Sequence, residues 1–433
     1  MILKTIFYVD NYRGFSKQFI ELGAVNFFVG ENSSGKTSIV SLLTLISNPK
    51  FWYTFEFDDE GIDLGAYEDI FSYKHDSNHF TIGFYSKLNS KKKTDYMHLL
   101  KFKNRDGMPA VCEEYILEND TLLSIRHNTK TAVYKVTKMT SCEECATSFS
   151  TCIEFITNMN FVDGKRISKK EGSNDILTYL SLIHQKDPEI KEQFSNFIPI
   201  SYMETRGISL VAPIRAKPKN IYTGNKISYD VEGEYAPYII KGLFKIKAQK
   251  KIDKETQEQI NYLFEFGKES GLFDNISVEQ FSKKSNSPFE IDILKSNGKY
   301  KINNVGYGVS QVLPVLTSTL GVAPGNWVSI QQPEVHLHPR AQAAFGELVF
   351  IAATGLKRKF IIETHSDYVI DRFRYKLKNS DEKLDARVMF FENVEGINKI
   401  VSMNIQKNGS YPTNQPDGFR KFFIDETMNL LGI

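Results

Sequence analysis

The residues with the clearest chemical meaning lie in the stretch VGENSSGKT, from Val29 to Thr37, which satisfies the pattern G-x-x-x-x-G-K-[ST]. Glycines in such a loop let backbone N–H groups turn inward around phosphates, and the helix that leaves the loop adds its positive end. The pattern predicts that Lys36 reaches the β and γ phosphates of a nucleotide and that the Thr37 hydroxyl holds Mg²⁺. A glycine turn without a ligand is the alternative. The predicted nucleotide ligands are Gly30, Asn32, Ser33, Ser34, Gly35, Lys36 and Thr37.

Two further glycines precede an apolar helix in the stretch VGYGVSQVLP, from Val305 to Pro314. Ser310 is expected at the start of this helix, where a serine cap and the helix end together favour an anion. Within one subunit this helix end has no evident target. We therefore expect Ser310 to contact the γ phosphate bound by the opposite subunit of a dimer, the alternative being an ordinary cap without a ligand.

A third candidate group follows the apolar strand WVSI and contains Gln331, Gln332 and Glu334. In phosphate-loop enzymes this strand end supplies carboxylates to the Mg²⁺ shell and to the attacking water. The carbonyl of Gln331 is predicted to support Mg²⁺, and Gln332 to orient water. An amide accepts no proton, so general-base help worth roughly 10²- to 10⁴-fold is expected to be missing unless Glu334 replaces it.

Two more candidates are a histidine and an arginine. His365, in the stretch FIIETHSD, follows a core strand, and the carboxyl ends of such strands face the ligand crevice of open α/β sheets. His365 is predicted to sense the γ phosphate. Arg215 lies between Pro213 and Pro218 in a rigid loop, and is either a cation near the nucleotide or a structural partner of a core carboxylate.

Two groups raise the question of a zinc site. Cys142 and Cys145 have zinc-knuckle spacing, and Cys152 with Cys112 or His127 could complete four ligands, but no second CxxC or HxxxH lies nearby. Free thiols in an insertion are the favoured interpretation. His336 and His338 lie beside a proline, where packing and hydrogen bonding are favoured over a metal.

The elements that must position these residues follow from periodicity. Strands are predicted at 2–9, 16–20 and 24–29, and a helix at 37–46 leaves the loop. Five alternating stretches predict an antiparallel sheet beside the nucleotide core, at 79–86, 96–103, 109–117, 122–127 and 131–136. Helical periodicity then predicts a helical insertion over 142–198. In the second half, strands are predicted at 197–210, 275–280, 289–295, 300–303, 387–392 and 397–403, and helices at 236–247, 254–267 and 419–431.

Composition and charge narrow the class of protein. With 433 residues, 41% of them hydrophobic, the chain can bury a large core, and no apolar run approaches the roughly 20 residues of a membrane span. The first residues start a strand rather than a signal peptide, so a cytoplasmic location and no membrane contact are expected. The net charge of +2 provides no global field for nucleic acid. Six lysines between Lys241 and Lys254 form a cluster that either meets phosphate backbone or, as we favour, is a solvated face.

Taken together, these stretches resemble the ABC-type ATPase heads of the RecF, SMC and OLD group. GENSSGKT, the segment around Ser310, QQPEVHLHP and ETHS look like the phosphate loop, signature, Walker B and switch-histidine elements of the OLD-like branch. The resemblance implies a phosphate-loop α/β fold with a flanking antiparallel sheet and a compact helical insertion in place of a coiled coil. It divides the chain into residues 1–89 (first half of the head), 90–198 (strands and insertion) and 199–433 (second half).

The resemblance also implies a function. Relatives include antiphage defence ATPases of the Septu, PARIS and Gabija systems, which work with a separate or fused nuclease. We therefore expect ATP and Mg²⁺ as cofactors, a head-to-head ATP-sandwich dimer, slow hydrolysis, and a separate effector, since only 68 residues follow His365. The alternatives are a RecF-like DNA repair ATPase and a nucleotide-binding scaffold without turnover.

Overall fold

The computed structural model of the chain contains two compact groups of residues. Unit 1 comprises 1–22, 41–207 and 393–400, and unit 2 comprises 23–40, 208–392 and 401–433. The structure describes residues 2–59, 61–72, 77–88, 94–128, 131–139, 149–168, 176–188, 190, 194, 207–224, 229–247, 252–282, 284, 286–416, 418–419 and 428.

Unit 2 is built around a six-stranded sheet with the order β12-β16-β17-β3-β18-β19, of which only residues 393–400 of β18 and β19 are assigned to unit 1. The strands from β12 to β18 run parallel to their neighbours. β3 lies inside the sheet and is apolar on both faces, with Val25, Phe27 and Phe28 fully buried, as a strand covered on both sides requires. The strands are β3 (Val25–Gly30), β12 (Ser209–Val211), β16 (Trp327–Gln331), β17 (Lys359–Glu363), β18 (Ala386–Val394) and β19 (Ile397–Asn404).

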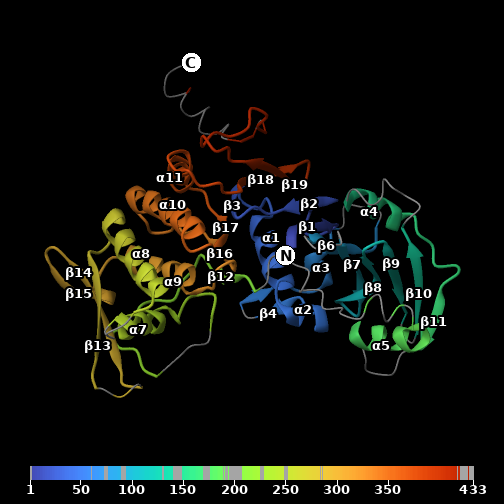
Figure 1. The fold of residues 1–433 in the computed structure, drawn as a ribbon, viewed down its shortest axis with the longest axis horizontal. Helices are drawn as coiled ribbons and strands as arrows, with labels where there is room; N and C mark the ends of the chain where they lie inside the picture. The colour runs from blue at the N-terminus through green and yellow to red at the C-terminus, as the bar shows by residue number, and fades with distance from the viewer. Residues whose placement is uncertain are drawn as a thin grey trace. The chain divides into compact units, whose positions relative to one another are not determined.

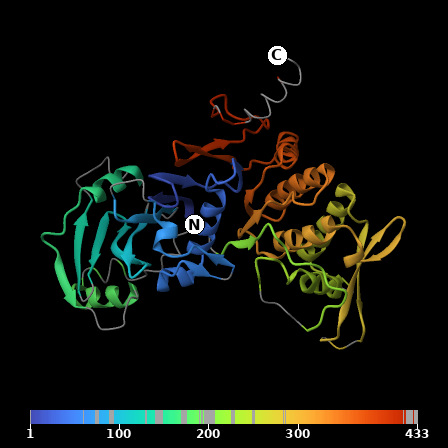
Figure 2. The ribbon, with the colours of Figure 1, turned by 180° about the vertical axis from the view of Figure 1, so that it is seen from behind.

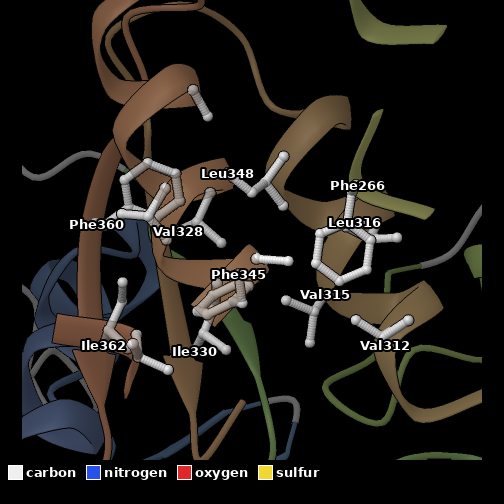
Figure 3. Close-up of a cluster of buried hydrophobic side chains, with 14 of the residues drawn as sticks. Phe266, Val312, Val315, Leu316, Val328, Ile330, Phe345, Leu348, Phe360 and Ile362 are labelled. Carbon is white, nitrogen blue, oxygen red and sulfur yellow. The ribbon is translucent and has the colours of Figure 1, made fainter. Parts of the chain in front are cut away.

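Helices of unit 2 cover this sheet and form its core (Figure 1). α10 packs against α8 and α11, and α9 lies against β16. Figure 3 shows Val328 and Ile330 of β16 and Phe360 and Ile362 of β17 facing side chains of α8, α9 and α10, all of them buried. The helices are α7 (Ala236–Lys247), α8 (Lys254–Ser270), α9 (Tyr307–Gly321), α10 (Pro339–Thr354) and α11 (Asp367–Lys378).

A small antiparallel sheet completes the described part of unit 2. It consists of β13 (Asn275–Gln280), β14 (Phe289–Lys295) and β15 (Gly298–Lys301). A 3-10 turn, η3 (Ile302–Asn304), then connects β15 to α9. α9 therefore starts shortly after this sheet, and its exposed first residues follow a short, well-defined connection.

Unit 1 contains an eight-stranded antiparallel sheet with the order β11-β10-β9-β8-β7-β6-β1-β2, coloured blue to green in Figure 2. Most neighbours are consecutive in sequence, so hairpins build most of the sheet. The strands are β1 (Ile2–Asp10), β2 (Gln18–Glu21), β6 (Phe80–Leu88), β7 (Thr94–Arg105), β8 (Met108–Glu118), β9 (Thr121–His127), β10 (Thr131–Lys138) and β11 (Lys165–Ser168).

Helices of unit 1 pack against the two faces of this sheet. Phe149, Cys152 and Ile156 of α4 (Phe149–Thr157) join a core with Tyr85 and Met97. Trp52 of α2 (Pro49–Thr54) instead packs on Phe84 and His98, which neighbour those residues in the strands and so point to the other face. The remaining elements are α3 (Tyr67–Ile70), α5 (Ile176–Lys186), β4 (Asp58–Asp59) and β5 (Ile62–Asp63).

Most predicted elements are confirmed. The five strands of the flanking sheet, the helix at 236–247 and the strands at 275–280 and 289–295 form where the sequence predicts them. The predicted insertion at 142–198 contains α4 and α5 but also β11, so it is not purely helical. The strand predicted at 197–210 lies outside the described residues up to 206, and β12 covers its end. The helix predicted at 419–431 lies largely outside them. Among the described helices, none is both long and apolar enough to span a bilayer.

Candidate functional site

The predicted phosphate loop connects β3 to α1 (Lys36–Ile46) at the carboxyl end of the parallel sheet (Figure 1). Gly30, Ser33 and Gly35 have φ angles of +137°, +63° and +91°, so the backbone repeatedly enters the left-handed region, as loops that turn successive N–H groups toward an anion require. A Cβ atom on Gly30 would lie 2.0 Å from the carbonyl oxygen of Phe391. The loop therefore has backbone conformations suited to phosphate, and at Gly30 only glycine fits.

The side chains of the loop divide into buried and exposed groups. Lys36 is buried, and its Nζ donates to the carbonyl oxygens of Gly30 at 2.9 Å and Glu31 at 2.5 Å. Burial lowers the pKa of Lys36, while the charges of Glu363 and Glu31 oppose that shift. The Ser34 hydroxyl closes the loop by donating to the Glu31 carbonyl at 2.7 Å. Asn32, Ser33 and Thr37 remain exposed, so the loop presents polar groups to a ligand.

A carboxylate lies against the loop where the sequence analysis predicted only amides. The Thr37 hydroxyl is 2.9 Å and 3.2 Å from the two carboxylate oxygens of Glu363, at the end of β17. The side chain of Gln331, at the end of β16, donates from Nε2 to the same carboxylate at 3.1 Å. Glu363 is 4% exposed and Gln331 6%. Thr37, predicted to bind Mg²⁺, is thus joined directly to an acidic group and through it to Gln331.

The predicted catalytic residues follow the same strand ends. Glu334 accepts hydrogen bonds from the Thr364 hydroxyl at 2.8 Å and from the backbone N–H of His365 at 2.7 Å. Gln332 has a φ of +44°, and its N–H donates to the carbonyl of Glu363 at 2.7 Å. His365 is exposed at the start of the turn into α11. The structure thus brings Glu334 and His365 into contact. The backbone of Gln332 is hydrogen-bonded to that of Glu363, two residues before His365.

Arg215 contacts the backbone of Gln331 and Gln332. Its Nη2 donates to the carbonyls of Gln331 at 2.8 Å and Gln332 at 3.3 Å. Burial lowers the pKa of Arg215 to about 10, and the nearby Glu334 charge acts in the opposite direction. Nε and Nη1 have no hydrogen-bond partner within the described part of the chain. One of the two predicted roles of Arg215 was to pair with a core carboxylate. The hydrogen bonds of its guanidinium instead go to the carbonyls of the strand ends.

The prediction for Ser310 as a helix cap is wrong. α9 begins at Tyr307 with Gly306 as its N-cap, so Ser310 lies one turn inside the helix. Its side chain is buried, and its hydroxyl donates to the Tyr307 carbonyl at 2.9 Å. The exposed residues at this helix end are Gly306 and Tyr307. Contact between Ser310 and a nucleotide on an opposite subunit stays a prediction.

The residues considered for zinc have other roles where the structure describes them. The Nδ1 of His338 caps α10 by accepting from the N–H of Arg340 at 3.3 Å, and the ring of His336 lies 5.8 Å from that of Tyr307. The described residues contain one group of three potential ligands, on β13 and β14, and it includes neither histidine. Cys152 is buried in α4 and forms no disulfide with Cys112, the other described cysteine. Cys142 and Cys145 lie outside the described residues.

The sequence analysis missed two residues of this site. Glu363 follows three apolar residues at the carboxyl end of a strand, the same signal that drew attention to Gln331 and His365. Thr364 is buried and links Glu334 to the turn before α11. The partner of Thr364, Glu334, follows another strand, so the sequence around Thr364 does not reveal this contact.

Comparisons with known proteins identify the family. Residues 1–370 match the AAA ATPase domain family. No curated protein matches the chain. Similar solved structures include the SMC head domain from Thermotoga maritima, with 12% identity, a TM-score of 0.39, and coverage of 92% of this chain and 98% of that one. Another is the Smc head domain with an extended coiled coil bound to the C-terminal domain of ScpA, derived from Pyrococcus furiosus. It has 11% identity and a TM-score of 0.42, and the match covers 99% of this chain and 100% of that one. The family match and the observed α/β phosphate-loop architecture with its flanking antiparallel sheet confirm the predicted fold class, and the chain belongs to the AAA ATPase domain family.

Proposed function

We propose that the chain binds ATP with Mg²⁺ on the loop from Gly30 to Thr37 and uses the nucleotide as a slow switch. The observation that carries this proposal is the cluster of Lys36, Thr37 and Glu363 at the carboxyl end of β3, within one compact unit. A concave backbone, a buried ammonium and a hydroxyl beside a carboxylate fit a metal-bound triphosphate. When bound, Mg²⁺ would neutralise phosphate charge in the site.

Slow turnover follows from the groups available to activate water. Gln332 accepts no proton at its amide, and both carboxylate oxygens of Glu334 accept hydrogen bonds from the turn that carries Thr364 and His365. A carboxylate held in this way is restrained from approaching an attacking water. We infer that Glu334 acts as a base only when this turn moves. We also infer that His365, which lies in this turn, senses the γ phosphate.

The proposal extends to assembly. We infer a head-to-head dimer of the ABC type in which the exposed start of α9 at Gly306 and Tyr307, with Ser310 one turn further along the helix, completes the site of the opposite subunit. We also infer a separate effector, a nuclease in bacterial antiphage defence, that reads the nucleotide state. The support is the resemblance of the site motifs to the OLD-like branch. A cytoplasmic location belongs to the same proposal.

Two other functions make different predictions. A RecF-like DNA repair ATPase would hydrolyse ATP faster in the presence of DNA. A scaffold without catalysis would bind nucleotide and never release phosphate. The restrained Glu334 favours slow catalysis over a motor, because a motor requires repeated turnover.

Single-turnover ATP hydrolysis, measured beside sedimentation, tests the proposal. We compare the wild type with Lys36→Ala and Gln332→Glu, with and without DNA. We expect ATP to dimerise the wild type with turnover well below about 1 s⁻¹, Gln332→Glu to raise the rate, and Lys36→Ala to prevent both binding and dimerisation. Turnover of about 1 s⁻¹ or faster in the wild type, or strong stimulation by DNA, would contradict the slow switch.

A further inference from the structure

Glu363 is a buried acid whose partners are all polar groups of the nucleotide loop and of the neighbouring strand end. Its two oxygens contact the Thr37 hydroxyl at 2.9 Å and 3.2 Å, and Oε2 accepts from Gln331 at 3.1 Å. Burying a carboxylate costs free energy unless hydrogen bonds and nearby positive charge compensate. Lys36 is the charge that acts on it, but the ammonium donates to loop carbonyls and not to Glu363. The arrangement leaves an acid beside Thr37 without a direct ion pair to a described cation.

The position of Glu363 corresponds to that of Gln331 on the adjacent strand. β16 and β17 run parallel, and Gln331 lies opposite Glu363 in their register. A carboxylate at the end of β17 therefore reaches the same edge of the sheet as one at the end of β16 would. Moving the acid by one strand keeps negative charge next to Thr37 although the end of β16 carries only amides.

The hydrogen bond between the two side chains also assigns a role to Gln331. An ionised carboxylate only accepts hydrogen bonds, so the amide group facing Glu363 is the NH₂ group. Gln331 thus acts on Glu363 as a donor and fixes its orientation. The NH₂ group of Gln331, and not its carbonyl, faces the acid beside Thr37, which argues against the predicted role of Gln331 as the Mg²⁺ ligand.

We propose that Glu363 is the protein carboxylate that binds the Mg²⁺ of the bound nucleotide and that Gln331 is its positioning residue. This inference rests on the proposed function. Mg²⁺ in nucleotide sites prefers oxygen ligands and commonly takes one or two carboxylates together with phosphate oxygens and water. The Thr37 hydroxyl, which now donates to Glu363, has an oxygen that can face the same ion.

The proposal has a thermodynamic signature. Without metal, the negative charge of Glu363 repels the phosphates, and with metal it attracts the ion that binds them. Glu363 therefore increases the ratio between nucleotide affinity in Mg²⁺ and affinity in a chelator. A role in folding alone, or as a base for water, leaves this ratio unchanged.

Equilibrium binding of a fluorescent ATP analogue in Mg²⁺ and in EDTA measures this ratio. Glu363→Gln keeps the shape of the side chain and removes its charge. We expect it to lower the Mg²⁺-dependent gain in affinity by roughly tenfold or more, with affinity in EDTA equal or higher. Mn²⁺ bound in the presence of ADP, counted by electron paramagnetic resonance, should fall in parallel.

A charge swap supplies the decisive comparison. The double variant Gln331→Glu with Glu363→Gln returns a carboxylate to the same sheet edge from β16, and we expect it to recover part of the Mg²⁺ dependence. Glu347→Gln is the matched control, because it removes one negative charge from a carboxylate of the same unit that pairs with Arg372 and Lys376 instead of Thr37. We expect its Mg²⁺ dependence to match the wild type.

The outcomes separate this inference from the proposed function. If Glu363→Gln folds, as judged by its thermal unfolding, and keeps the full Mg²⁺ dependence, the inference is wrong and the proposed function stands. If the wild type binds no nucleotide in either buffer, the proposed function fails, and the inference fails with it. If Glu347→Gln loses the Mg²⁺ dependence as strongly as Glu363→Gln, the effect is general electrostatics and the assignment to Glu363 is overturned.

Discussion

At the scale of single residues, Gly30 is the most constrained position of the loop. Its φ of +137° is unfavourable for any other residue, and an added Cβ would lie 2.0 Å from the Phe391 carbonyl oxygen. We expect Gly30→Ala to cost about 2 to 6 kcal/mol of stability, as the sum of backbone strain and overpacking. Chemical denaturation, followed together with nucleotide binding, measures both consequences.

Gly242 provides the control for that substitution. It lies inside α7, and a Cβ built there has nothing within 4 Å. Gly242→Ala is expected to stabilise the protein by up to about 1 kcal/mol, because alanine favours helix. Equal effects of the two substitutions would show that the close approach to Phe391 does not limit the loop.

The same scale shows which site residues a sequence can reveal. The phosphate loop was predictable because its ligands are consecutive and its glycines serve the backbone. Glu363 and Thr364 were missed because their partners, Thr37 and Glu334, come from other segments. Ser310 was misplaced by one turn, since a glycine-rich segment does not reveal which residue begins the helix.

At the scale of elements, three strands of unit 1 share a buried acid. Glu114 of β8 lies 2.6 Å from Nε2 of His98 on β7 and 3.5 Å from Nε2 of His127 on β9. Burial raises the pKa of Glu114, but the close contact with His127 and the hydrogen bond with His98 outweigh it, so the pKa lies below its ordinary value of 4.5. The ionised form is therefore favoured in the folded sheet, and stability from Glu114 is present above the ordinary pKa and lost as pH falls through the lower folded value.

Glu114→Gln tests this effect. We expect a loss of about 1.5 to 3 kcal/mol at pH 7, typical of hydrogen bonds to a charged group. The difference from the wild type should persist down to about pH 5 and shrink below the ordinary carboxyl pKa. Thermal unfolding between pH 3 and 7 measures it, with the exposed Glu154→Gln on α4 as the control. A difference that is constant across this range would contradict the assignment.

Elements differ in how well the sequence predicts them. β6 to β10 alternate in pattern and pair with sequence neighbours, so both the strands and their sheet followed from the chain. α2 was missed although Asn48 and Pro49 form a normal helix start, because its six residues include three aromatic side chains with modest helix propensity. The order of the unit 2 strands depends on contacts between distant segments, and the sequence analysis did not predict it.

At the scale of the whole molecule, the two tryptophans report on different units. Trp52 is buried in unit 1 and Trp327 in unit 2, which contains the candidate nucleotide site. We expect ATP at about 100 times its dissociation constant to stabilise unit 2 by about 2.7 kcal/mol. In denaturant unfolding followed by fluorescence, Trp52→Phe isolates the signal of Trp327, and Trp327→Phe isolates that of Trp52.

The nucleotide should move the Trp327 transition more than the Trp52 transition. Lys36→Ala, which removes the buried ammonium of the loop, should abolish the shift in both variants. Identical shifts at the two tryptophans would mean that the two units unfold as one cooperative body. The structural division into two compact units would then have no thermodynamic counterpart.

The position of β3 in its sheet also determines how long this strand waits for its partners during translation. Val25 pairs with Phe360 of β17 and with Ala386 of β18, so both neighbours of the strand are made at least 335 residues after it. At about 5 to 20 residues per second, the ribosome needs roughly 15 to 70 s to deliver them. Throughout that time an apolar strand made for the centre of a sheet has neither partner. Until β17 and β18 have been translated, this strand must therefore be kept from pairing with other chains.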